Sequence, residues 1–231
     1  MSNIFSRNSL LYGQDFVDKL TNAKIAICGV GAVGSVVAEA LARLGVGTFF
    51  LFDFDEVEES NINRQLCALH STIGKKKVDV VSERILDINP NSNVLKFPQF
   101  LDSSNMENLF SLNPDVIVDA IDSIDSKAEL ICQSAQRNLK IVSSMGAARK
   151  LDTEQIFISD ILSTKVCPLA SRMRKELRSK GIDKKIPCVF STEPALKDSH
   201  ATLSDKKIIG SSVLITAIFG LKLANLAIHE L

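Results

Sequence analysis

The feature that most constrains the fold of this chain is a glycine pattern near its beginning. Gly29, Gly31 and Gly34 form a GxGxxG loop that follows the β-rich run 24–28 and precedes the apolar, helically spaced run 35–44. In such a unit the first glycine permits a tight turn, the second lets a phosphate approach the backbone, and the third lets the helix pack closely. The helix N-terminus also offers unpaired N–H groups and a partial positive charge to an anion. The pattern therefore predicts an α/β unit that binds a nucleotide.

Strand-like and helical runs alternate through the first part of the chain. We expect strands at 24–28, 48–52, 94–97, 116–120 and 141–144, and helices at 35–44, 75–88 and 126–137. This alternation predicts an α/β, Rossmann-like fold with a mostly parallel central sheet and helices on both faces. After Gly146 we expect a less regular C-terminal region with an edge strand at 156–161, a basic helix at 168–180 and a short β-like run at 188–192.

Composition excludes several classes of protein. The 27 basic and 27 acidic side chains give no net charge, which excludes a generally polybasic nucleic-acid binder but leaves room for a local basic patch. The hydrophobic content of 45% excludes disorder as the main state. Five widely spaced cysteines without a CxxC pair exclude a four-cysteine zinc ribbon and indicate reduced thiols. Because the first ten residues also lack an apolar signal core, we expect a cytoplasmic protein.

The apolar stretch 208–228 invites comparison with a membrane span. It is almost long enough to cross a bilayer, but Lys222 lies inside it, with Ser211, Ser212 and Thr216 nearby. We therefore predict a buried C-terminal helix, placed at a dimer interface, and no stable membrane insertion. Peripheral membrane association is left open.

The residues after the second expected strand indicate which nucleotide is bound. Asp53 ends that strand, where its carboxylate can accept from ribose hydroxyls, as in NAD-binding folds. However, Arg64 and the run Lys75, Lys76 and Lys77 follow closely. An NAD enzyme has no evident need for these cations, whereas a triphosphate has, because its leaving pyrophosphate carries dense negative charge. The cations therefore favour ATP over NAD.

Three motifs carry a resemblance to a known family. The pattern DxDxVxxxNxxRQ at 53–65, with GxxK at 74–77 and DAIDS at 119–123, resembles the adenylation domain of the ubiquitin-activating and sulfur-carrier-activating superfamily. Members attack the α-phosphate of ATP with a carboxylate. The resemblance implies a single ATP-binding adenylation domain over 1–231, with a nucleotide-binding core at 1–150 and substrate-side and dimerisation elements at 151–231.

The same resemblance assigns roles to individual residues. Asp53 would hold the ribose, and Lys77 would stabilise charge that develops at the α-phosphate. Asp122 would help to hold Mg²⁺ through ATP. Arg7 would reach the γ-phosphate of ATP, bound either in its own subunit or in a partner subunit. Lys77, Arg64 and Asp122 form the expected catalytic set. The expected ATP-binding set is Gly29, Gly31, Gly34, Asp53, Asp55, Asn61, Arg64, Gln65, Lys77, Asp122, Ser123 and Arg7.

A narrower resemblance covers almost the whole chain. The segments LLYG at 10–13, NRQLCALHSTIGKKK at 63–77, DAIDSIDSKAELI at 119–131 and CVFSTE at 188–193 look like the tRNA threonylcarbamoyladenosine dehydratase family. This implies ATP-dependent dehydration of threonylcarbamoyladenosine in tRNA, in which an adenylated carboxylate closes into a ring. Expected partners are such a tRNA, a second copy of the chain and a sulfur-transfer protein. Expected cofactors are ATP and Mg²⁺, with a monovalent cation left open.

Several residues are candidates for the substrate side, each with a plainer alternative. The basic run Arg172, Arg174, Lys175 and Arg178 would contact tRNA phosphates, or would form a solvated helix face. Lys127 would contact substrate or pair with Asp122. Cys188 would be a substrate-loop residue, a buried thiol or a relay for sulfur. The segment 193–210, expected to cover the substrate, is shorter than the family leads us to expect.

Three other functions stay open on the sequence. The first is an adenylyltransferase that activates the Gly-Gly tail of a ubiquitin-like or sulfur-carrier protein without tRNA. The second is an NAD-dependent oxidoreductase, against which Arg64 and Lys77 argue. The third is a scaffold that binds ATP without consuming it.

Overall fold

The computed structural model describes residues 4–196 and 209–231, so most of the expected covering segment lies outside the described residues. One seven-stranded sheet runs through the molecule in the order β3-β2-β1-β4-β5-β7-β6. All neighbouring pairs are parallel except β6 and β7, which are antiparallel. The strands are β1 (Lys24–Cys28), β2 (Thr48–Phe52), β3 (Asn93–Phe97), β4 (Val116–Asp119), β5 (Ile141–Ser144), β6 (Ile156–Asp160) and β7 (Pro187–Ser191).

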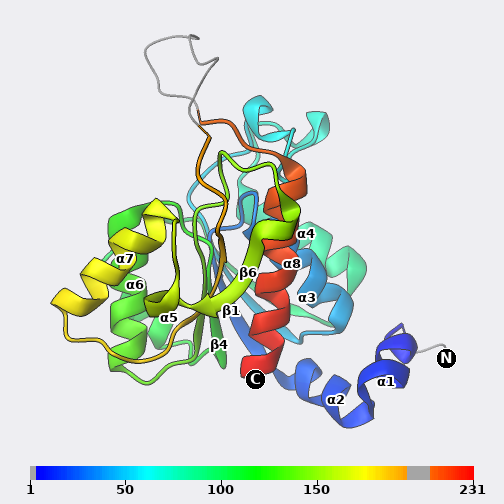
Figure 1. Ribbon diagram of the computed structural model, residues 1–231. Coiled ribbons are helices and arrows are strands. Elements are labelled where there is room, and N and C mark those ends of the chain that lie inside the picture. Colours follow the sequence, from blue (N-terminus) through cyan, green and yellow to red (C-terminus); the bar gives the residue numbers. More distant parts are fainter. Residues whose placement is uncertain (1–3, 197–208) are drawn as a thin grey trace.

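Alternate residues along the strands feed two separate hydrophobic clusters, one on each face of the sheet. Ile25 and Ile27 of β1 point to one cluster, and Ala26 and Cys28 point to the other. The first face is covered by α3 (Gly34–Leu44), α4 (Lys77–Ile88) and α8 (Val213–Glu230), and the second by α5 (Met106–Phe110), α6 (Ile124–Gln136) and α7 (Pro168–Ser179). Figure 1 shows the two layers of helices on either side of the sheet.

The expected fold class is therefore confirmed. The expected strands 24–28, 48–52 and 141–144 have the observed bounds, and β6 is an edge strand as expected. Two short helices near the beginning, α1 (Ser6–Tyr12) and α2 (Gln14–Asn22), were missing from our expectation, as was α5. The helices α1 and α5 span only seven and five residues, too few to show a helical period, whereas α2 is amphipathic and its apolar spacing was overlooked.

The C-terminal helix belongs to the hydrophobic core. By length and composition alone, α8 could cross a membrane, which is weak evidence because core helices pass the same test. It packs against α3 and against β4, β5 and β7. The fit is close: a Cβ on Gly220 would lie 2.6 Å from the Cβ of Val36. The buried helix that we expected is confirmed on the side that packs against α3 and the sheet, whereas Val213, Leu214 and Leu221 of α8 are exposed.

Candidate active site

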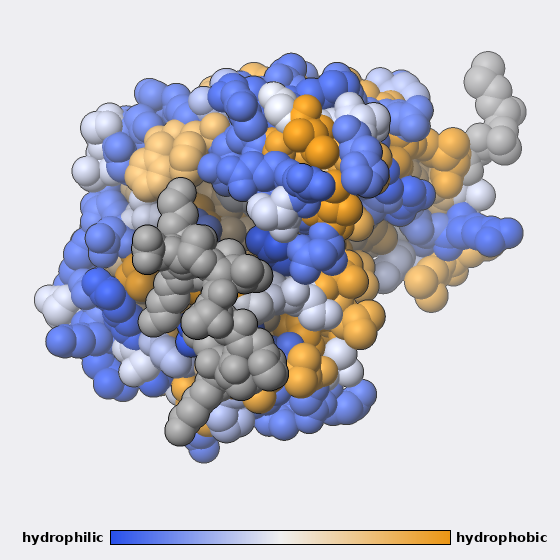
Figure 2. All heavy atoms as spheres, turned by 90° about the horizontal axis from the view of Figure 1, so that it is seen from above, coloured by the Kyte–Doolittle hydropathy of each residue, from blue (hydrophilic) through white to orange (hydrophobic). Residues whose placement is uncertain are grey.

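A cavity of about 520 Å³ opens at the carboxyl ends of the parallel strands. It lies where the strand order reverses, because β1 is flanked by β2 on one side and by β4 on the other. Ligands in open α/β sheets bind in this crevice. The wall contains predicted site residues from four segments, namely Gly29, Gly31, Asp53, Asp55, Arg64, Gln65, Lys77 and Asp122. In Figure 2 the face seen from above is mostly hydrophilic, with hydrophobic residues in separate patches.

The glycine loop is closely packed against its neighbours. Gly29 has a φ of +87°, which disfavours any other residue. A Cβ on Gly34 would lie 1.8 Å from the carbonyl oxygen of Gly29, so Gly34 permits the helix to begin against the loop and does not itself line the cavity. A Cβ on Gly31 would meet only the side chain of Gln65, at 3.8 Å. The loop is thus tight at its ends and open beside Gly31, as phosphate binding requires.

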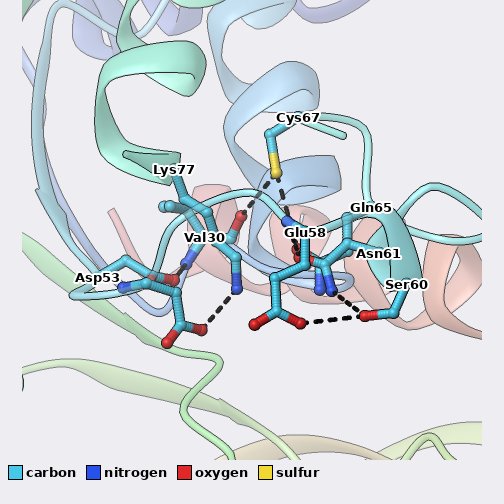
Figure 3. A network of polar contacts seen from close by, with 9 residues as sticks. Val30, Asp53, Glu58, Ser60, Asn61, Gln65, Cys67 and Lys77 are labelled. Carbon is cyan, nitrogen blue, oxygen red and sulfur yellow. Dashed lines mark hydrogen bonds and ion pairs between the residues drawn. The ribbon is translucent and has the colours of Figure 1, made fainter. Parts of the chain in front are cut away.

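Asp53 anchors this loop from the end of β2. Its Oδ2 accepts the backbone N–H of Val30 at 2.8 Å, and its Oδ1 accepts that of Asp55 at 2.9 Å (Figure 3). Burial raises the pKa of the Asp53 carboxyl, and the nearby Lys77 charge works in the opposite direction. Because each carboxylate oxygen has two lone pairs, Asp53 keeps acceptor capacity for hydroxyl donors in the cavity.

Lys77 begins α4 and faces the cavity as a buried cation. Its residue is 5% exposed, and its Nζ donates to Oδ2 of Asp55 at 2.6 Å. The backbone N–H of Lys77 also donates to the carbonyl oxygen of Asp55 at 3.0 Å. By contrast, Lys76 forms an exposed ion pair with Glu56. The structure therefore separates Lys77 from its neighbour and makes Asp55 its partner.

The loop that carries Arg64 and Gln65 is shaped by Asn61. Asn61 is buried, its Oδ1 accepts the Glu58 N–H at 3.2 Å, and its carbonyl oxygen accepts the N–H groups of Arg64 and Gln65 (Figure 3). Asn61 is not part of the cavity wall. Arg64 reaches the wall, where its Nη1 donates to the carbonyl oxygen of Ser60 at 2.9 Å. These hydrogen bonds give Asn61 a role in building the loop, and its expected contact with ATP stays a prediction.

Asp122 is exposed at the cavity wall after β4, whereas Ser123 lies at the start of α6 and outside the wall. Over the described ranges 4–196 and 209–231, no cluster of three His, Cys, Asp or Glu side chains could hold a metal ion. A Mg²⁺ ion at Asp122 would thus need phosphate oxygens as further ligands, which is its usual arrangement in nucleotide sites.

Two predicted substrate contacts are wrong. Lys127 is 0% exposed, and its Nζ donates to Oδ2 of Asp119 at 2.6 Å, so it pairs neither with substrate nor with Asp122. Cys188 is also fully buried, within β7, and burial strongly raises the pKa of its thiol. A thiol of this kind is a core side chain, which removes the substrate-loop role and argues against the sulfur relay.

The basic run lies on α7, where its members differ in exposure. Arg172, Lys175 and Arg178 are exposed, with the guanidinium of Arg172 3.8 Å from Oδ1 of Asp125. Arg174 is half-buried and donates to Oγ1 of Thr164 at 2.6 Å, so part of its guanidinium is held within the protein, and its phosphate contact stays a prediction. Arg7, on the exposed helix α1, is not part of the cavity wall.

The structure adds wall residues that sequence reasoning missed. They include the aromatic pair Phe54 and Phe100, with ring centroids 5.1 Å apart, the side chain of Gln99 and the loop after β5. Nε2 of Gln99 is buried and has no hydrogen-bond partner among residues 4–196 and 209–231. The sequence could have indicated these residues only by their position directly after strands, at the carboxyl edge of the sheet. A glycine-lined loop, a ribose-type carboxylate, nearby cations and this orphaned amide together fit a nucleoside triphosphate.

Comparison with known proteins agrees with this geometry. The sequence model of the ThiF family matches residues 5–229. The chain belongs to the ThiF family. A tRNA threonylcarbamoyladenosine dehydratase of Bacillus subtilis is 43% identical over 84% of this chain and 76% of the relative. One of the same name from Escherichia coli is 33% identical over 98% of this chain and 92% of the relative.

Solved structures extend the comparison to three dimensions. The E. coli tRNA N6-threonylcarbamoyladenosine dehydratase, TcdA, in complex with ATP superposes with a TM-score of 0.91 at 34% identity, covering 98% of this chain and 92% of that one. E. coli MccB with ATP, at 20% identity and a TM-score of 0.66, shares the fold. The narrower family resemblance found in the sequence is thereby confirmed.

Proposed function

We propose that this ThiF-family chain is an ATP-dependent enzyme that dehydrates N6-threonylcarbamoyladenosine in tRNA to a cyclic form. The observation that carries the proposal is the combination of near full-length similarity to dehydratases with a cavity that unites Asp53, Lys77, Arg64 and Asp122. The relatives of that name supply the substrate, and the cavity supplies the groups that adenylation needs.

The chemistry explains why these groups are needed. A carboxylate is a poor acyl donor, because its leaving group would be oxide. Transfer of AMP to one carboxylate oxygen, with release of pyrophosphate, creates a good leaving group. A nitrogen or oxygen of the same modification then attacks the carbonyl carbon and expels AMP, which carries that oxygen away. Ring closure within one molecule loses little further entropy, so positioning is most of the remaining work.

Each wall residue has a defined task in this scheme. Asp53 accepts hydrogen bonds from ribose hydroxyls while it holds the glycine loop through Val30. Lys77 and Arg64 offset the negative charge that develops around the α-phosphate and pyrophosphate. Asp122 supplies one carboxylate to a Mg²⁺ ion that is otherwise held by phosphates. We infer that Asp55 orients Lys77, and we retain Gln65 as a phosphate-orienting residue on the wall.

The exposed cations of α7 are our proposed contact to the tRNA backbone. Arg172, Lys175 and Arg178 lie on the solvent side of the helix, while Met173 and Leu177 anchor its other side in the core. Phosphate contacts of this kind position a nucleic acid without reading its sequence.

We also infer a homodimer and a cytoplasmic enzyme. The dimer is inferred from two exposed apolar surfaces, one formed by Leu214 and Leu221 of α8 and the other by α1. Among its described residues α1 buries none, and it exposes Leu10, Leu11 and Tyr12. In a dimer, Arg7 of α1 would be available to the ATP of the other copy. Dependence on Mg²⁺ belongs to the proposal, whereas the monovalent cation, the sulfur-transfer protein and peripheral membrane association stay hypotheses with no supporting contact.

The test is nucleoside mass spectrometry on tRNA that bears threonylcarbamoyladenosine, after incubation with the protein and Mg-ATP. The proposal predicts loss of one water from the nucleoside with one AMP released per product. An unchanged nucleoside would overturn it. If ATP–pyrophosphate exchange then appeared only with a carrier protein ending in Gly-Gly, the chain would be an adenylyltransferase.

A further inference from the structure

A buried ion pair lies directly beneath the active-site cavity. Asp119, the last residue of β4, and Lys127, in α6, are both 0% exposed, and their Oδ2 and Nζ atoms are 2.6 Å apart. Taking two charges out of water is costly, and well-packed hydrophobic residues often replace such pairs without loss of stability. Stability alone therefore explains poorly why this pair is present.

The pair connects three segments of the chain. Oδ2 of Asp119 accepts the Ser143 hydroxyl at 2.5 Å, and Nζ of Lys127 donates to the carbonyl oxygen of Ser144 at 3.0 Å. Oδ1 of Asp119 accepts the backbone N–H of Ile121 at 3.1 Å. The end of β4, the first turns of α6 and the end of β5 are thus joined by one fully buried polar cluster.

Both strand ends continue directly into the cavity wall. Ala120, Ile121 and Asp122 follow β4, and the segment 145–148 follows β5. The loop after β4 also packs closely against the glycine loop, since a Cβ on Gly29 would lie 2.7 Å from the carbonyl oxygen of Ala120. The position of the buried cluster therefore sets the relative positions of three parts of the wall.

We propose that Lys127 is a positioning residue of the reaction. With Asp119 and Ser143 it fixes the loop after β4, so that the Asp122 carboxylate stands across the cavity wall from Lys77 and Arg64. This inference rests on the proposed function, because it gives Asp122 a task at Mg-ATP. It assigns no contact with substrate to Lys127 itself.

Ser143→Ala is the gentlest variant that loosens the cluster, because it removes the hydrogen bond to Asp119 and the longer one from Lys127 at 3.4 Å and leaves the charges paired. Ser134→Ala is the matched control. Ser134 in α6 is equally buried, but its Oγ has no hydrogen-bond partner within the described part of the chain, and it lies outside the cavity wall. Lys127→Met is the stronger variant, and its folding is to be checked by thermal melting before use.

Hydrogen–deuterium exchange reports how firmly the loop after β4 is held and does not depend on enzyme activity. In Ser143→Ala the Ile121 amide should exchange faster than in the unchanged protein, whereas Ser134→Ala should leave its rate the same. Calorimetric titration of ATP at several Mg²⁺ concentrations supplies the second readout. In that titration, Ser143→Ala should reduce the gain in ATP affinity that Mg²⁺ brings. The Kd for ATP without Mg²⁺ should stay within about twofold of that of the unchanged protein, which is about the precision of the titration.

A double-mutant cycle on AMP release separates positioning from general damage. Ser143→Ala should reduce kcat about tenfold, because displacements of an ångström can cost about 10²-fold. In an Asp122→Asn background the same change should cost less than about twofold, since the residue being positioned is already lost. Equal losses in the two backgrounds, or unchanged exchange at Ile121, would overturn the inference. If the unchanged protein releases no AMP, the proposed function fails, and the exchange result still decides the positioning of the loop.

Discussion

At the scale of single residues, Lys77 is the side chain on which the account depends most. It is buried at the cavity wall and held by Asp55, whereas the adjacent Lys76 pairs with Glu56 at the surface. We expect Lys77→Ala to reduce AMP release by about 10²-fold or more, the scale of losing a preorganised stabiliser of transition-state charge. Steady-state kinetics with the control Lys76→Ala checks this. Equal activity of both variants would remove Lys77 from the reaction.

The cysteines give a second prediction at this scale. Burial raises the pKa of the thiols of Cys28, Cys132 and Cys188, and that of Cys67 to about 11. Because only the thiolate reacts, these thiols should resist iodoacetamide at neutral pH in the folded protein and react after unfolding. Cys188→Ala should keep its turnover. Rapid native labelling of Cys188, with loss of turnover in that variant, would restore the sulfur relay.

The sequence predicts the role of a residue when that role depends on neighbours in the sequence, and it fails when the role depends on segments brought together by the fold. Asp53 and Arg64 lie in one motif, and Lys77 ends the GxxK pattern that follows it, so their shared place on the wall was predictable. The burial of Lys127 was not, because it depends on β4 and β5 lying side by side with α6 packed over them. The wall residue Gln99 was missed because the loop after β3 carries no motif.

At the scale of elements, the strands were predictable because parallel strands buried on both faces read as continuous apolar runs. The helices α3, α4 and α6 were predictable from apolar spacing, although α4 begins at Lys77, two residues later than expected, and α6 begins at Ile124, two residues earlier. The short helices α1, α2 and α5 have no side-chain cap at their N-termini, so the sequence gives no start signal for them.

The basic helix α7 supports a prediction about tRNA binding. We expect the double change Lys175→Glu and Arg178→Glu to weaken binding and to flatten its dependence on salt, by about one unit of slope for each phosphate that the helix no longer neutralises. The control is Lys19→Glu with Lys24→Glu, on exposed positions of α2 and β1 away from α7 (Figure 1). A titration over a range of salt concentrations measures both. Identical slopes for the two double variants would take α7 out of the interface.

At the scale of the whole molecule, α1 is the element that the single chain leaves least explained. Leu10 is 88% exposed and Leu11 is 74% exposed, and the helix projects beside α2 (Figure 1). We expect the protein to sediment as a dimer and Leu11→Glu to sediment as a monomer, because a charge in an apolar interface is strongly disfavoured. Analytical ultracentrifugation checks this against Leu86→Glu, a half-exposed leucine on α4. A monomer without any substitution would end the dimer proposal.

The central claim, that the chain adenylates a carboxylate of the tRNA modification, is tested most directly by tracing oxygen. Threonylcarbamoyladenosine-bearing tRNA is prepared with a heavy oxygen isotope in the threonyl carboxylate and incubated with the protein and Mg-ATP. Adenylation followed by ring closure moves one carboxylate oxygen onto the phosphate of AMP, so mass spectrometry should find one heavy oxygen in the released AMP and an unlabelled pyrophosphate. Released AMP without heavy oxygen, with the label kept wholly in the nucleoside or lost as water, would contradict the account.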